Sequence, residues 1–137
     1  MIETMTPSPA GRSKKSAGGG RPLASLTASE VAFLRSARLL GRLATVGPDG
    51  IPHVTPVGWS LRDDGTIEVG GRNFARTKKF RDVARTGRAA IVIDEVLPPW
   101  RPRGVEIRGQ AEALADLGVI RIHPSRVVSW GLAETQG

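Results

Sequence analysis

Apolar residues recur at helical intervals where the globular part of the chain begins, directly after a helix start signal. Thr27-Ala28-Ser29-Glu30 is a capping box, in which the Thr27 hydroxyl accepts from the amide three residues on and Glu30 reaches back. Val31 and Leu34 then continue with helical spacing. The pattern predicts a helix that begins after Thr27 and ends before Gly41.

From Gly41 onwards apolar and polar residues alternate, and turns rich in glycine, proline and aspartate separate the alternating runs. A second helix is expected from Thr77 to about Arg85. Residues 97–103 contain three prolines and Trp100, and are expected to form a rigid loop. The period of two predicts strands over residues 41–46, 51–61, 66–69, 89–96, 105–113, 120–122 and 127–130.

Six or seven short strands, two helices and short loops predict a mainly β fold, a small antiparallel barrel with helices at its ends. Residues 23–137 are expected to form this single domain. Residues 1–22 are expected to be a disordered basic tail, because they hold too few large apolar residues to offset the entropy of ordering. They also lack the apolar middle region of a secretory signal.

The composition excludes several kinds of chemistry. The 137-residue chain has no cysteine, no tyrosine and two histidines, so thiolate catalysis is excluded and a metal site is not expected. No apolar run approaches the ~20 residues of a membrane helix, so we expect a cytoplasmic protein without a membrane partner. Arginine outnumbers lysine sixteen to four, a bias typical of a GC-rich, actinobacterial genome.

Positive charge is concentrated in residues 71–88, which hold seven basic residues and one acid, Asp82, for a formal charge of +6 in a chain of +7. A helix N-terminus at Thr77, beside Lys78 and Lys79, suits a phosphate or carboxylate group. The alternative interpretation is that these basic residues form a solvated helix face that binds no ligand. A nucleic-acid partner is not expected, because the stretch lacks aromatic platforms for bases and Phe80 has the spacing of a core residue.

The strand expected over residues 51–61 contains two prolines and a glycine, which are unusual inside a sheet because proline cannot donate to the ladder. Pro52 and Pro56 therefore indicate an edge, a bulge or a backbone reserved for a ligand. Alternation places His53, Thr55, Val57 and Trp59 on one face and Val54, Pro56, Gly58 and Ser60 on the other.

The order and spacing of these segments resemble a known family. A capped helix is followed by LATVGPDGIPHVTPVGW, TIEVGGRNFARTKKFRDVARTGRAAIVID, WRPRGVEIRGQAEAL and RIHPSRVVSWG. This order resembles the split-barrel flavin-binding superfamily of pyridoxamine phosphate oxidase, and within it the class that uses the deazaflavin coenzyme F420. The closing segment is similar to an actinobacterial subgroup that includes reductases of tetracycline-type polyketides. The resemblance covers residues 26–132.

The resemblance implies a homodimer of six-stranded split barrels with two cofactor sites at the subunit interface. The tricyclic ring is expected to lie along the strand formed by His53, Val54, Thr55, Pro56, Val57 and Gly58. The family's phosphate-binding segment matches Arg72, Asn73, Arg76, Thr77, Lys78 and Lys79. On the same basis, the cofactor of the partner subunit is expected to be approached by Trp100, Arg101 and Arg103.

Two segments depart from the family pattern. Pyridoxamine phosphate oxidases have Asn-Tyr and Ser-Arg-Lys where this chain has Asn73-Phe74 and Thr77-Lys78-Lys79, with one extra residue. The connection at residues 114–118 is shorter than the resemblance implies. If it shortens the last strand, the substrate pocket or the dimer edge differs from the family's.

The resemblance implies an oxidoreductase that transfers a hydride between F420 and a small conjugated substrate. The alternatives are an FMN-binding flavoprotein or oxidase of the same fold, and a non-catalytic cofactor-binding protein. The cofactor carries the chemistry, so no side-chain nucleophile is needed. His53 is the one side chain near the expected ring suited to donate a proton, although a single histidine on a strand is more often structural. Asp94 and Glu95 point to opposite faces of a strand, which argues against shared acid–base work.

Overall fold

The computed structural model describes residues 25–132 of the chain. The predicted tail at residues 1–22 lies outside this range, and its disorder stays a prediction. Among residues 25–132, no helix is both long and apolar enough to cross a membrane.

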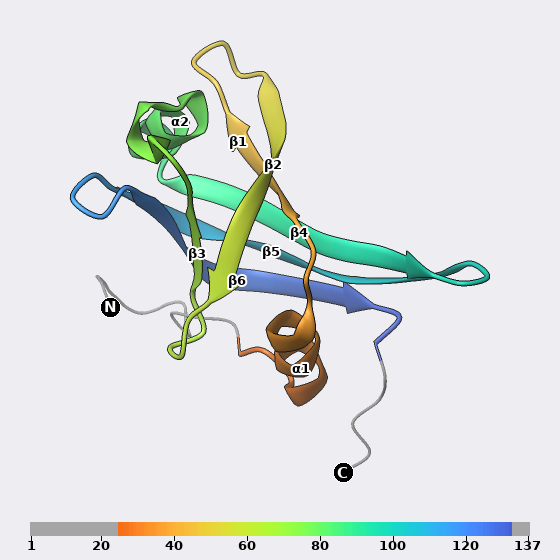
Figure 1. Cartoon of the computed structure of the whole chain (residues 1–137). Helices are drawn as coiled ribbons and strands as arrows, with labels where there is room; N and C mark the ends of the chain where they lie inside the picture. Colours follow the sequence, from red (N-terminus) through yellow and green to blue (C-terminus); the bar gives the residue numbers. More distant parts are fainter. Residues whose placement is uncertain (1–24, 133–137) are drawn as a thin grey trace.

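Six antiparallel strands close into a barrel in the order β1-β2-β3-β6-β5-β4 (Figure 1). The strands are β1 (Gly41–Val46), β2 (Pro52–Leu61), β3 (Ile67–Gly70), β4 (Arg88–Leu97), β5 (Arg101–Leu114) and β6 (Val119–Trp130). The helices are α1 (Ala28–Ser36), α2 (Lys78–Thr86) and the short 3-10 helix η1 (Phe74–Arg76). The predicted fold class, a mainly β split barrel with flanking helices, is confirmed.

Alternating side chains of every strand fill the barrel. On β1 and β3, for example, Leu43, Ile67 and Val69 are fully buried, with polar or half-exposed neighbours between them. These side chains pack in the barrel interior against buried apolar residues of the other strands, which are Val57, Ala89, Ile91, Ile93, Val105, Ile107, Ala111, Ile120 and Ile122. The period-two pattern in the sequence is therefore the inside–outside alternation of a closed sheet.

Helix α1 lies at one end of the barrel and is capped as the sequence predicts. The Glu30 amide donates to the Thr27 hydroxyl at 3.1 Å, and the Thr27 amide donates to the Glu30 carboxylate at 2.8 Å. The buried Glu30 also accepts from Ser129 on β6 at 2.6 Å, which ties α1 to the barrel. Between α1 and β1, the Leu39 carbonyl accepts from the Trp59 indole at 2.8 Å.

Helix α2 covers the opposite end of the barrel (Figure 1). Thr77 caps it by accepting from the Phe80 amide at 3.3 Å, as the sequence predicts. Gly87 ends it with φ +70°, a left-handed conformation that glycine adopts without a steric penalty. Phe80 and Val83 are buried against the barrel, so the helix presents its basic residues away from the core.

Two predictions for the last third of the chain are wrong. Residues 97–103 are not a loop, because Leu97 pairs with Arg101 and Val96 with Pro102, leaving only Pro98-Pro99-Trp100 at the hairpin tip. The two short strands expected around His123-Pro124 are one continuous strand, β6. An irregularity opposite Arg108 and Gly109 accommodates the proline within the ladder, which local sequence rules do not anticipate.

The short connection after β5 does not shorten the last strand. Residues 115–118 form a tight turn in which the Gly118 amide donates to the Leu114 carbonyl at 2.8 Å. Gly118 has φ +66°, which closes the turn without strain. β5 and β6 then pair along almost their full lengths.

Candidate functional site

Strand β2 presents its predicted ligand-binding residues on two opposite faces. His53, Thr55 and Val57 point toward the barrel interior and its α2 end, and are half-buried or buried. Val54, Pro56 and Gly58 point outward and are exposed, Val54 to 69%. A Cβ built on Gly58 would meet no atom within 4 Å, so the backbone there is open to a flat ligand.

The outward face of β2 continues onto β1 and β4 as an apolar surface. Ala44 lies opposite both Val54 on β2 and Ala90 on β4. Arg42 lies within this outward face, opposite Pro56 on β2 and Val92 on β4, and pairs with Asp94 at 2.6 Å. We call this surface the β2 strip; it consists of Pro52, Val54, Pro56 and Gly58 with Ala44, Val46, Ala90 and Val92.

The predicted phosphate-binding segment is a compact turn between β3 and α2. Phe74 is buried, and its ring meets Phe80 edge-on at 6.2 Å, which anchors the turn to the helix. Asn73 has φ +51°, a left-handed conformation that asparagine tolerates better than most residues. Arg72, Asn73 and Arg76 are exposed around this anchor. The structure therefore places three predicted ligand-binding residues on one solvent-facing turn.

The two lysines at the start of α2 point in different directions. Lys78 pairs with Asp82 at 3.3 Å, one helical turn further on. Lys79 lies over the Phe74 ring, with its ammonium 5.5 Å from the ring centre, a cation–π contact. Lys78 is thus held by a carboxylate of α2 itself, whereas Lys79 lies against the turn that contains Phe74.

A buried carboxylate organises the basic residues of α2. Asp82 is 1% exposed and accepts from Thr45 at 3.0 Å, from Lys78 at 3.3 Å and from Arg85 at 3.3 Å. Burial acts to raise the pKa of Asp82, but the hydrogen bonds from Thr45 and Lys78 outweigh it, and the pKa lies below its ordinary value. Arg85 also donates to the Val46 carbonyl.

His53 and Lys78 converge on the turn between β1 and β2. A Cβ built on Gly47 would lie 3.0 Å from the His53 Nε2, 3.0 Å from the Lys78 Nζ and 3.1 Å from the Asp49 carboxylate. Two atoms that each lie 3.0 Å from one point are at most 6.0 Å apart. The structure thus brings His53 together with Lys78 at the α2 end of β2, on the face opposite Val54.

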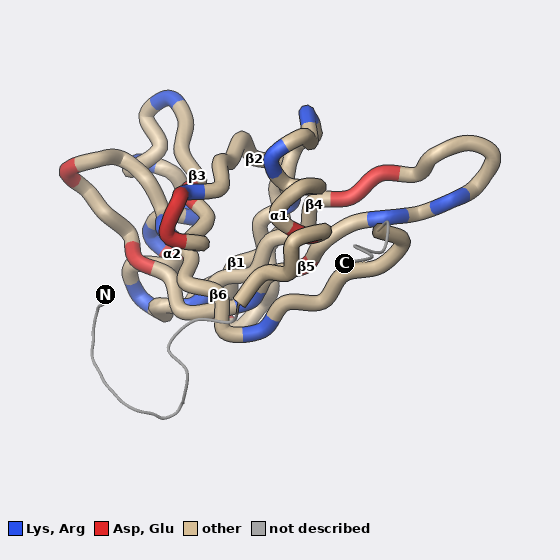
Figure 2. The backbone as a smooth tube through the Cα atoms, turned by 90° about the horizontal axis from the view of Figure 1, so that it is seen from below, with Lys and Arg blue, Asp and Glu red and all other residues tan. Residues whose placement is uncertain are grey.

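The remaining predicted residues lie elsewhere in the chain. The β4–β5 hairpin projects from the barrel, away from α2 (Figures 1 and 2). At its tip Trp100 is 75% exposed and Arg101 donates to the Pro98 carbonyl at 3.1 Å. Arg103 pairs with Glu95 at 2.6 Å and lies over the Phe33 ring. Within one chain these residues do not meet residues 72–79.

Sequence reasoning missed Thr45, Asp82 and Arg85 as parts of the site. In the sequence, Asp82 was recognised only as the single acid in a basic stretch. Its spacing to Lys78 and Arg85 nevertheless places all three residues on one helix face. Thr45 lies 37 residues away in sequence, so no local pattern links it to Asp82.

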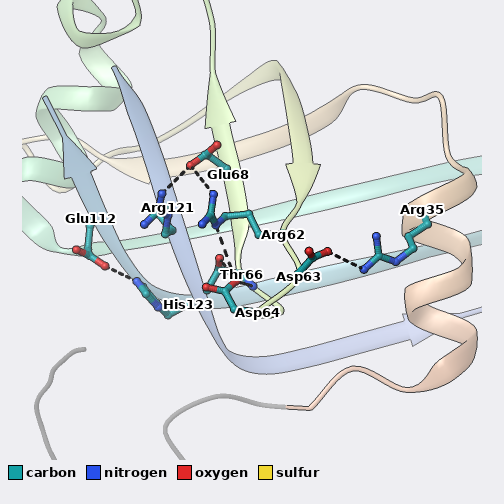
Figure 3. A network of polar contacts seen from close by, with 9 residues as sticks. All are labelled: Arg35, Arg62, Asp63, Asp64, Thr66, Glu68, Glu112, Arg121 and His123. Carbon is teal, nitrogen blue, oxygen red and sulfur yellow. Dashed lines mark hydrogen bonds and ion pairs between the residues drawn. The ribbon is translucent and has the colours of Figure 1, made fainter. Parts of the chain in front are cut away.

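His123 lies outside this site. It pairs with Glu112 across the β5–β6 ladder, beside a charged network on the outer face of the barrel (Figure 3). In that network Glu68 accepts from Arg121 at 2.8 Å and from Arg62 at 3.5 Å. Asp94 and Glu95, the other paired acids of the sequence, bind two different arginines, Arg42 and Arg103.

A closed antiparallel barrel of six strands flanked by helices is the architecture of the split-barrel proteins. The sequence profile of the pyridoxamine 5'-phosphate oxidase family matches residues 26–130, and the chain belongs to this family. It is 44% identical to the 5a,11a-dehydrotetracycline/5a,11a-dehydrooxytetracycline reductase of Streptomyces rimosus, over 77% of this chain and 83% of that protein. These two findings support an oxidoreductase.

Solved structures share the fold at low sequence identity. A conserved hypothetical protein from Mycobacterium tuberculosis superposes with a TM-score of 0.63 at 22% identity, covering 80% of this chain and 87% of that one. An F420 reductase gives 0.58 at 20% identity, covering 75% and 98%. A FAD-binding protein from Mesorhizobium loti also gives 0.58 at 20% identity, covering 76% and 94%. At this identity the likeness extends to the fold alone.

Proposed function

We propose that the protein is a reductase that binds the deazaflavin coenzyme F420 and transfers a hydride to a small conjugated organic substrate. The observation that carries the proposal is the arrangement along β2, where the exposed, apolar β2 strip adjoins a basic turn at its α2 end. The apolar strip suits the flat ring of such a cofactor, and the basic turn suits its acidic tail. The 44% identity to a reductase supports the direction of the reaction.

The residues present fit such a cofactor. Gly58 leaves the β2 backbone open where a ring would lie, and Val54 and Pro56 supply a flat apolar face. From Val54 to Gly58 the strand extends for four residues, or about 13 Å at ~3.3 Å per residue, enough for a tricyclic ring. Thr55 and Val57 form the inward side of the same strand. When bound, a reduced deazaflavin supplies the hydride.

The basic turn holds the acidic part of the cofactor in this proposal. The Lys78 ammonium lies near Gly47 in the β1–β2 turn, and Arg72, Asn73, Arg76 and Lys79 lie in and beside the turn between β3 and α2. We assign His53 to this end as well, since its Nε2 lies near the Lys78 Nζ and on the face opposite Val54. The protein's contribution is therefore orientation and charge.

A second copy of the chain completes the site in this proposal. Trp100 and Arg101 lie on a projecting hairpin that does not meet the basic turn of its own chain. A homodimer brings that hairpin, together with Arg103, to the β2 strip of the partner. Dimerisation would also cover an apolar surface that includes Val54, 69% exposed, and Val46, 43% exposed. A cytoplasmic location stays a prediction.

FMN is the second candidate cofactor, because it also combines a tricyclic ring with a phosphate. The FAD-binding protein of the same fold supports a flavin in place of F420.

A titration of the full chain with F420 and with FMN, each followed by ligand fluorescence, decides between the two. Bound deazaflavin absorbs near ~420 nm and bound FMN near ~450 nm, properties of the cofactors that identify which one the protein retains. We expect tighter binding of F420 than of FMN, and a gain of absorbance at ~420 nm when the enzyme transfers a hydride from reduced F420 to the substrate and so regenerates the oxidised cofactor. Tighter binding of FMN would select the flavoprotein alternative, and binding of neither would contradict the proposal.

A further inference from the structure

A groove of about 790 Å³ lies between α1 and β2, at the barrel end opposite α2. Its volume is within the range of small-molecule sites, roughly 300–1,000 Å³. The groove is formed by the C-terminal half of α1, the connection to β1 and the second half of β2, and its lining includes Leu34, Arg35, Arg38, Leu40, Gly58 and Trp59.

The walls of the groove are mostly apolar and are held in place. Trp59 donates its indole N–H to the Leu39 carbonyl at 2.8 Å, so the ring has its polar atom satisfied and a fixed position. Leu34 is buried beneath the groove, while Leu40 is 60% exposed at its edge. Such walls suit a flat hydrocarbon ring system.

Among residues 25–132, the charged residues that line the groove are Arg35 and Arg38. The Arg38 guanidinium donates to the carbonyls of Ser36 and Ala37, and no carboxylate among residues 25–132 pairs with it. Arg35 reaches toward Asp63 in the β2–β3 turn, at 3.6 Å (Figure 3). Asp63 is fully exposed, and an exposed pair of this kind contributes little and exchanges readily. The groove is therefore positively charged at its rim.

The groove adjoins the proposed cofactor strand. Gly58 belongs both to the β2 strip and to the groove lining, and the Gly58 backbone is open. Along β2 the order is therefore basic turn, apolar strip and arginine-rimmed groove.

We infer that this groove binds the substrate and selects flat, conjugated organic anions, whose carboxylate, phenolate or enolate oxygen is held by Arg38 with help from Arg35. The inference rests on the proposed function for the identity of the ligand as substrate. Charge selection follows from the lining itself, because a guanidinium group binds a carboxylate with two parallel hydrogen bonds and a phenolate or enolate oxygen with a charge-assisted hydrogen bond.

The test uses anthracene-2-carboxylate and its neutral carboxamide as probes, titrated into the full-length protein and followed by anthracene fluorescence. We expect the acid to bind about three- to tenfold more tightly than the amide, the effect of one partly screened charge-assisted contact.

Arg38→Gln should remove most of the preference for the acid while leaving amide binding unchanged. Arg126→Gln, an exposed arginine on β6 outside the lining, is the matched control and should keep the preference. Ser60→Phe should weaken both probes by filling the groove.

Equal binding of acid and amide, or an equal loss in Arg126→Gln and Arg38→Gln, overturns the inference. Displacement of the acid by saturating F420 or FMN overturns the substrate assignment, since the groove would then hold the cofactor. The same variants are titrated with both cofactors, and Arg38→Gln should retain their affinity. A protein that binds neither cofactor but keeps the Arg38-dependent preference contradicts the proposed function and leaves the charge-selective groove standing.

Discussion

At the scale of single residues, Asp82 is the group whose ionisation matters most to the candidate site. It is buried, holds Lys78 and Arg85 on α2, and accepts from Thr45 on β1. Because its pKa in the folded protein lies below the ordinary value of 3.8, its ionised form stabilises the folded state. This contribution is present above the pKa of the unfolded chain and is lost as pH falls through the folded pKa.

We predict that Asp82→Asn lowers the free energy of unfolding at pH 7 by about 1–3 kcal/mol, the cost of leaving buried donors poorly matched. The difference from the wild type should shrink as pH falls below the ordinary value of 3.8 and then through the lower pKa of the folded protein, where the buried carboxylate becomes protonated. Urea unfolding at pH 7 and at a series of pH values below 3.8 measures this change. Asp116→Asn, in the exposed β5–β6 turn, is the control and should change neither. A difference that stays constant with pH would contradict the role of the charge.

Substitution of His53 tests whether the α2 end of β2 binds the acidic part of the cofactor or supplies a proton at its reacting ring. We predict that His53→Gln weakens cofactor binding by about three- to tenfold, as expected for one partly screened contact. Turnover at saturating cofactor should stay within about twofold of the wild type, since loss of a proton donor costs at least ~10²-fold. Cofactor titration and steady-state kinetics separate the two effects. A large loss of turnover with unchanged affinity would instead make His53 the proton donor.

At the scale of elements, β2 is the strand whose prolines and glycine we attribute to ligand binding in the proposed function. We predict that Gly58→Val weakens cofactor binding by at least about tenfold, because a branched side chain would occupy the open strip. The melting temperature should not fall, since a Cβ at Gly58 meets no atom within 4 Å and valine suits a strand. Ligand titration and thermal melting are the measurements.

Arg126→Val, an exposed strand position on β6, is the control for Gly58→Val and should leave cofactor affinity unchanged. Unchanged affinity in Gly58→Val would show that the ring does not lie on the β2 strip.

Local signals in the sequence predicted the elements well where neighbours in sequence decide the structure. The caps at Thr27 and Thr77 and the turn at residues 47–50 depend on residues three or four apart, and all three are present. The continuous strand β6, which was not predicted, depends instead on contacts between residues far apart in sequence. Gly109 admits the His123 carbonyl so closely that a Cβ would lie 1.9 Å from its oxygen, and this long-range contact lets Pro124 remain inside β6.

The residues of the candidate site could likewise be proposed from the sequence where the signal is local, and not where it depends on contacts between distant residues. Composition located the basic turn, and proline and glycine located the unusual strand, because both signals are local. The pairing of Asp82 with Thr45, and the meeting of His53 with Lys78 at Gly47, depend on the closure of the barrel. The groove beneath Trp59 likewise depends on how α1 packs, which no residue pattern specifies.

At the scale of the whole molecule, the account predicts a homodimer. A stable dimer of this kind buries roughly 2,000 Å² or more in total. Sedimentation velocity at micromolar concentration should show a dimer. We expect Trp100→Ala to weaken dimerisation and cofactor binding together, because the hairpin tip is proposed to reach the site of the partner. A compact monomer that still binds cofactor with full affinity would rule out the shared site.

The central claim is that the basic turn at the start of α2 holds the acidic part of a cofactor whose ring lies on β2. Fluorescence titration of Lys78→Ala/Lys79→Ala with F420 and with FMN tests it most directly. We predict an affinity loss of about tenfold to several hundredfold for the preferred cofactor, because two charge-assisted contacts are removed at ~1.5–3 kcal/mol each before screening. The matched control Arg88→Ala/Arg126→Ala, which removes two exposed charges elsewhere, should lose less than about threefold. Unchanged affinity of the lysine variant for both cofactors would contradict the claim and leave a solvated basic helix face.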